Sequence, residues 1–164
     1  MFAPAPLRNT PPAELYSGLL EQARALFAGE RDQTANAANL AALLFHTLPD
    51  LNWAGFYWMK DAVLVLGPFQ GKPACARIAL GKGVCGSAAQ ERRTIIVPDV
   101  SEFPGHIACD SASNSELVIP LQHAGRVVGV LDLDSPKLAR FTEHDARGLE
   151  ALAIAFVNAT DLGG

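Results

Sequence analysis

Cysteine is scarce in this sequence, with three residues in 164, and no two of them lie close together in the chain. The positions of Cys75, Cys85 and Cys109 exclude a CxxC motif of the thioredoxin type. They also disfavour a structural zinc site built from the three cysteines and His106, because such sites usually contain closely spaced cysteine pairs. Spacing alone leaves two alternatives open: a redox role for the thiols, or three small buried hydrophobic side chains.

Clustered basic charge and long apolar runs are also missing. The net charge is −4, from 13 Lys and Arg against 17 Asp and Glu, and the densest basic cluster is the pair Arg92 and Arg93. This charge distribution argues against a nucleic-acid partner. No segment approaches the roughly 20 apolar residues that span a bilayer, and residues 1–12 lack the features of a secretory signal. We therefore expect a cytoplasmic protein with reduced thiols and no membrane partner.

The length predicts a single domain, which we place at residues 13–164 behind a flexible, proline-rich arm at residues 1–12. Long helices are predicted from apolar residues at helical spacing in three segments: residues 11–28, 32–48 and 141–158. Thr10 is expected to cap the first helix. Thr142 and Asp145 are expected to form a capping box at the start of the last one.

The middle of the chain has the composition of strands, interrupted by a short helix at residues 84–90. The predicted strands are residues 51–59, 62–69, 74–80, 94–97, 116–122 and 127–134. Because helices flank a run of hairpin-like strands, the predicted fold class is α+β. We expect a mostly antiparallel sheet of about six strands, with the N- and C-terminal helices on one face and loops or a ligand over the other.

Three acidic residues are predicted to converge on one face of this sheet. Asp132 and Asp134 are two positions apart on a strand, so their side chains point to the same side. Glu116 opens the neighbouring strand of the same hairpin and falls near them. Such acids usually lie on a solvated face; if they are instead brought together, their repulsion requires a metal, an ammonium group or a shared proton.

Aromatic and thiol side chains add to the candidate site. Trp53 and Tyr57 share a face of the first strand, and Gly55 between them is expected to leave a flat recess for a small apolar or cationic group. An ordinary aromatic core is the simpler alternative. Cys75 falls in the third predicted strand. Cys85 lies at a helix N-terminus, where the backbone dipole favours a thiolate. Cys109 follows His106 in a polar loop, where the imidazole favours a thiolate and Asp110 opposes it.

Five segments closely resemble the free methionine-(R)-sulfoxide reductase family, single-domain enzymes built on the GAF fold. They are NWAGFYW at residues 52–58, GKGVCG at 81–86, VPDVSEFPGHIACD at 97–110, SNSELVIPL at 113–121 and VLDLDSP at 130–136. The resemblance implies that Cys109 attacks the sulfoxide sulfur and that Cys85 or Cys75 resolves the intermediate as a disulfide. The reversed assignment, with Cys85 attacking, stays open.

The same resemblance implies a substrate site and a reductant. The substrate-binding residues would be Trp53, Tyr57, Glu116, Asp132 and Asp134, with the acids on the amino group of free methionine sulfoxide and the rings around its S-methyl group. A thioredoxin-like reductant would restore the thiols, and neither a metal nor an organic cofactor is implied. The alternative function is a non-catalytic GAF module that senses a small ligand. A homodimer formed through the helices is compatible with the enzyme.

Overall fold

The computed structural model describes residues 10–106 and 111–163. Cys109, Asp110 and most of the arm expected at residues 1–12 lie outside these ranges. Within the described part of the chain, no helix combines the length and the apolar character needed to cross a bilayer.

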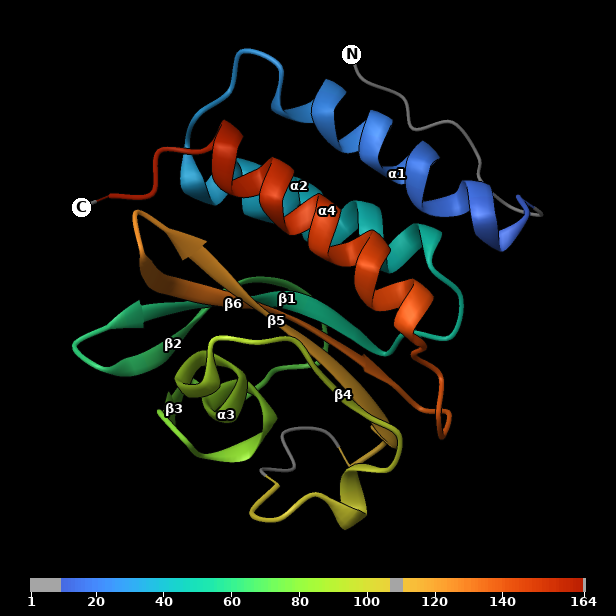
Figure 1. Cartoon of the computed structure of the whole chain (residues 1–164), viewed down its shortest axis with the longest axis vertical. Helices are drawn as coiled ribbons and strands as arrows, with labels where there is room; N and C mark the ends of the chain where they lie inside the picture. The colour runs from blue at the N-terminus through green and yellow to red at the C-terminus, as the bar shows by residue number, and fades with distance from the viewer. Residues whose placement is uncertain (1–9, 107–110, 164) are drawn as a thin grey trace.

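Three long helices form a layer over one face of the sheet (Figure 1). They are α1 (Pro12–Phe27), α2 (Gln33–Thr47) and α4 (Glu143–Ala159), so the predicted long helices are confirmed with small shifts at their ends. The predicted cap of α1 is wrong, because Pro11 is the N-cap and no side chain caps the helix. The capping box of α4 is confirmed: the Thr142 hydroxyl accepts from the Asp145 backbone N–H, and the Asp145 carboxylate accepts from the Thr142 backbone N–H.

The sheet has six strands, all antiparallel, in the order β3-β2-β1-β6-β5-β4. Its strands are β1 (Trp53–Lys60), β2 (Val63–Gly71), β3 (Arg77–Ala79), β4 (Ile95–Val97), β5 (Ser115–His123) and β6 (Arg126–Ser135). The third strand is shorter than predicted, because only Arg77–Ala79 pair with β2. Cys75 therefore lies in the segment that leads into β3 and not within a strand.

The two faces of the sheet carry different side chains. Phe56, Leu131 and Leu133 pack under the helical layer in the larger core. The alternate residues of the same strands point to the opposite face, where the short helix α3 (Gly83–Glu91) covers part of the sheet (Figure 1). This alternation confirms that Asp132 and Asp134 share a side opposite Leu131 and Leu133. The acids therefore lie on the side of α3.

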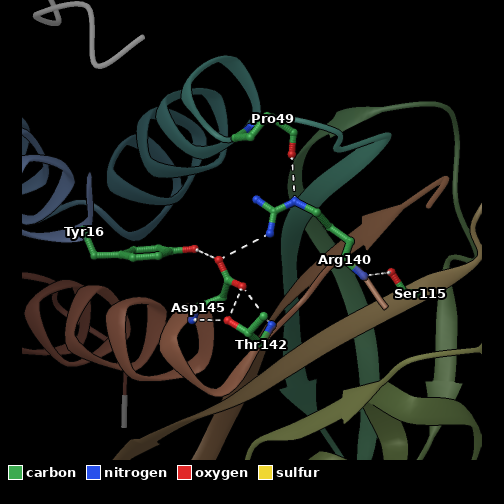
Figure 2. Close-up of polar contacts among 6 residues, drawn as sticks. All are labelled: Tyr16, Pro49, Ser115, Arg140, Thr142 and Asp145. Atoms are coloured by element: carbon green, nitrogen blue, oxygen red, sulfur yellow. Dashed lines mark hydrogen bonds and ion pairs between the residues drawn. The ribbon is translucent and has the colours of Figure 1, made fainter. Parts of the chain in front are cut away.

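A partly buried polar network joins the helical layer to the end of the sheet (Figure 2). The Tyr16 hydroxyl on α1 donates to Asp145 Oδ1 at 2.6 Å, and Arg140 Nη1 lies 3.3 Å from the same oxygen. Arg140 Nε donates to the carbonyl of Pro49, in the connection between α2 and β1, at 3.0 Å. The backbone N–H of Arg140 donates to Ser115 Oγ at the start of β5. This network thus fixes the segments that lead into two strands of the site.

Candidate active site

The register of the central strands brings three carboxylates together. Glu116 on β5 pairs with Asp134 on β6, and Asp132 lies two residues earlier on the same strand. Glu116 and Asp132 are each only 6% exposed. The predicted convergence of the acids is confirmed, while a solvated strand face is excluded for these two.

Helix α3 adds a thiol to this cluster. Cys85 is the third residue of α3, is buried, and donates a weak hydrogen bond to Glu116 Oε1 at 3.9 Å. Burial raises the pKa of the Cys85 thiol well above its ordinary value, and the charges of Asp132 and Glu116 raise it further. The thiolate expected from the helix dipole is therefore wrong, because desolvation and two nearby acids outweigh the dipole.

The pKa values of Glu116 and Asp132 are raised, which favours their protonated forms. Burial raises the pKa of Asp132, and the charge of Glu116 adds to the effect. Burial likewise raises the pKa of Glu116, followed by the charge of Asp134. Because burial raises the pKa of both Glu116 and Asp132, this buried pair favours keeping a proton. The site therefore contains a carboxylic acid that can donate a proton.

Two further details of the cluster bear on what it can bind. Asp132 Oδ1 is buried and has no hydrogen-bond partner among the described residues. His106 Nε2 lies 3.4 Å from Glu116 Oε2. Burial lowers the pKa of His106, so its ring favours the neutral form and does not neutralise the acids.

Aromatic rings form a second wall of the pocket. Trp53 and Tyr57 stack with their centroids 5.9 Å apart, and Trp53 Nε1 donates to the carbonyl of Lys72. The open recess predicted over Gly55 is wrong. A Cβ added at Gly55 would lie 2.3 Å from Phe69 Cβ and 2.6 Å from the Trp53 ring, because these side chains already fill that space. The glycine thus allows Phe69 to stack on Trp53, at 5.3 Å between centroids.

The acids, the Cys85 thiol, His106 and the rings of Trp53 and Tyr57 line one pocket, whose interior and open mouth together hold about 520 Å³ of free space. It is lined by Trp53, Tyr57, Pro73, Ala74, Ile78, Lys82, Gly83, Val84, Cys85, His106, Ser113, Glu116, Asp132 and Asp134.

The cysteines differ in state. Cys75 is half-buried and forms a disulfide, whereas Cys85 is a free, buried thiol. The disulfide of Cys75 is therefore not made with Cys85. It also removes Cys75 from any set of metal ligands in this state, so a zinc site of three cysteines and His106 is wrong here. Cys109 lies outside the described residues.

Comparisons with known proteins agree on one family. The GAF domain family model matches residues 34–159. The free methionine-R-sulfoxide reductase of Escherichia coli strain K12 is 52% identical over 139 residues, 85% of this chain and 84% of its own length. The chain belongs to the free methionine-R-sulfoxide reductase family.

Solved structures support this family assignment. The free methionine-R-sulfoxide reductase of Neisseria meningitidis, in complex with its substrate, superposes with a TM-score of 0.88 at 45% identity, covering 92% of this chain and 90% of that one. A Burkholderia vietnamiensis structure, named as a GAF sensor protein, has a TM-score of 0.89 at 59% identity and covers 92% and 96% of the two chains. The predicted GAF fold is thereby confirmed.

The pocket also contains residues that were not predicted from the sequence to lie there. Ser113 and Lys82 line it, and Asn52 supports Ser113 through a hydrogen bond from Nδ2 to Oγ at 3.0 Å. Both pocket residues lie in segments that carry the resemblance to the family, SNSELVIPL and GKGVCG. The two motifs therefore pointed to these residues, but only the folded structure shows that Lys82 and Ser113 line the same pocket as the acids.

Proposed function

We propose that this protein reduces free L-methionine (R)-S-oxide to L-methionine. One observation carries the proposal: three carboxylates and two stacked rings surround a single small pocket, in a chain that belongs to the free methionine-R-sulfoxide reductase family. The chemistry of the pocket matches that of the substrate, which has an ammonium group, a polar sulfoxide and an apolar methyl group.

The acids select a free amino acid. Glu116 and Asp134, paired across β5 and β6, bind the substrate ammonium group through charge-assisted hydrogen bonds. A methionine sulfoxide within a polypeptide has an amide in place of this ammonium and would leave the buried Glu116 without a counter-charge. Trp53 and Tyr57 pack around the S-methyl group.

Reduction begins with attack on sulfur. The Cys109 thiolate attacks the sulfoxide sulfur while Asp132, whose pKa is raised by burial, donates a proton to the sulfoxide oxygen. The oxygen passes to the cysteine, so that methionine leaves and Cys109 becomes a sulfenic acid. The raised pKa of Cys85 argues against Cys85 as the attacking group, since the thiolate is the nucleophile.

A second thiol then completes the cycle. The Cys75 thiol condenses with the sulfenic acid of Cys109 to form a disulfide and release water. Cys75 is favoured over Cys85 as the resolving residue because Cys75 is found in a disulfide, and Cys85 is buried and free. A thioredoxin-like dithiol supplies two electrons by exchange and restores both thiols. This cycle needs neither a metal nor an organic cofactor, and it suits a reducing cytoplasm.

The test is turnover of each sulfur epimer of free L-methionine sulfoxide with a thioredoxin recycling system. We expect loss of the R epimer alone and no turnover in Cys109→Ser, with thermal unfolding to show that this variant is folded. Persistence of both epimers, with the wild-type thiols confirmed reduced, would overturn the proposal. That result, together with ligand affinity unchanged in Cys109→Ser, would favour the sensing module suggested by the name of the Burkholderia vietnamiensis structure.

A further inference from the structure

We propose that this pocket also binds a thiophilic divalent cation, with Zn²⁺ as the model ion, through Cys85 Sγ and the carboxylates of Glu116 and Asp132. The three residues come from α3, β5 and β6, and one ligand atom from each lies within 4.8 Å of the others. All three side chains are buried. In the catalytic cycle proposed above, Cys85 takes no redox step, so its thiol remains available as a ligand.

A separate observation points to a ligand at this position. Only 6% of the Asp132 surface is exposed. Its Oδ1 is buried and has no hydrogen-bond partner among the described residues. An unpaired buried carboxylate oxygen is costly, and a bound cation would satisfy it. Asp134, which lines the same pocket, adds a further carboxylate that favours a cation there.

The ligand set selects the kind of cation. One sulfur and carboxylate oxygens suit Zn²⁺ and similar ions, whereas Mg²⁺ and Ca²⁺ require oxygen ligands. Zinc is tetrahedral and lies about 2.0–2.3 Å from such atoms, so two of its ligand atoms are separated by about 3.3–3.8 Å. The three ligand atoms lie within 4.8 Å of one another, so they would approach one another by up to about 1–1.5 Å when the ion binds. His106, whose Nε2 lies 3.4 Å from Glu116 Oε2, is a candidate for a fourth ligand.

Binding of the ion would oppose the reaction. The ion would occupy Glu116 and Asp132, which the proposed function assigns to the substrate, so the inhibition rests on that function while the binding itself does not. Because Cys85 stays a free thiol when Cys75 is in a disulfide, the site persists in the oxidised protein. In the disulfide form of the protein, metal binding by the Cys85 thiol can therefore be measured without competition from Cys75.

The experiment is a Co²⁺ titration of the full-length protein in its disulfide form, after thiol counting shows one free thiol per chain. Co²⁺ stands in for Zn²⁺ because a thiolate ligand gives a charge-transfer band in the near ultraviolet. We expect this band in wild type, its loss in Cys85→Ser, and binding weaker by about tenfold or more in Asp132→Asn. Asp61→Asn, in the exposed turn between β1 and β2, is the matched control and should bind as wild type does.

A wild-type titration without the thiolate band, or a Cys85→Ser variant with the wild-type band, would overturn the metal site. Zn²⁺ should also raise the apparent KM for the sulfoxide without lowering kcat at saturating substrate. The two proposals fail separately. If the thiolate band appears but there is no turnover, the metal site stands and the reductase proposal fails. If there is turnover but no band, the reductase proposal stands and the metal site fails.

Discussion

Replacing Asp145 by Asn should destabilise the protein strongly, although the residue lies away from the pocket. Its carboxylate accepts from the Tyr16 hydroxyl at 2.6 Å and from Arg140 at 3.3 Å through Oδ1. It accepts from the backbone N–H and the hydroxyl of Thr142, both at 2.7 Å, through Oδ2 (Figure 2). An amide keeps one acceptor oxygen, so one pair of these donors would face an N–H₂ group.

The magnitude follows from these contacts. A hydrogen bond to a charged group contributes about 1.5–3 kcal/mol, and the loss of an N-cap interaction costs about 1 kcal/mol. Hydroxyl groups can rotate to accept from the new amide, so we expect a net loss of about 2–4 kcal/mol in the free energy of unfolding. For a domain of this size that corresponds to a decrease in Tm of roughly 5–15 °C.

The loss should also depend on pH in a defined direction. Burial alone would raise the pKa of Asp145, but hydrogen bonds from Tyr16 and Thr142, with the Arg140 charge, hold it below its ordinary value. The unfolded chain therefore takes up a proton at a higher pH than the folded protein does. The stabilisation is fully present above the unfolded pKa of about 3.9 and is lost as pH falls through the folded pKa.

Urea unfolding at pH 7 of wild type, Asp145→Asn, Tyr16→Phe and the double variant measures both the loss and its coupling. Asp99→Asn is the control, because Asp99 also caps a helical turn but is only partly buried. A loss below about 0.5 kcal/mol, the range of ordinary surface substitutions, or additive effects of the two substitutions would refute this account of the network.

Three further predictions concern the pocket. Cys75→Ser should still form the first equivalent of methionine but lose steady-state turnover with thioredoxin, which rapid-quench and steady-state assays separate; unchanged turnover would exclude Cys75 as the resolving residue. Gly55→Ala should lower the free energy of unfolding in urea by about 1–3 kcal/mol, because its Cβ would overlap Phe69; wild-type stability would contradict the packing. Trp53→Ala should raise KM by about tenfold in steady-state assays, and an unchanged KM would remove this ring from the substrate site.

Much of the site could be predicted from short-range pattern. Alternation along β6 places Asp132 and Asp134 on one face, and the tight turn after β5 places Glu116 beside them. Both inferences depend only on strand periodicity and on hairpin pairing. The helices and the Thr142 capping box were predictable for the same reason, since local sequence determines them.

The remaining features depend on contacts between distant segments. The thiol state of Cys85 is set by burial against β5 and β6, which position at a helix N-terminus does not reveal. The space over Gly55 is taken by Phe69 from the neighbouring strand, so a glycine between two rings did not mean an open recess. Cys75 lies before β3 because edge pairing stops at Arg77. In each case the prediction used only the residues adjacent in sequence, whereas contacts with distant segments determined the outcome.

The most direct test of the proposed reaction is a single turnover of the fully reduced protein with free L-methionine (R)-S-oxide and no reductant. The account predicts about one methionine per chain, loss of two of the three thiols, and Cys85 as the thiol that remains, identified by alkylation and mass spectrometry. Formation of methionine with Cys85 consumed would contradict the assignment of the cysteines. Absence of methionine would contradict the reductase itself.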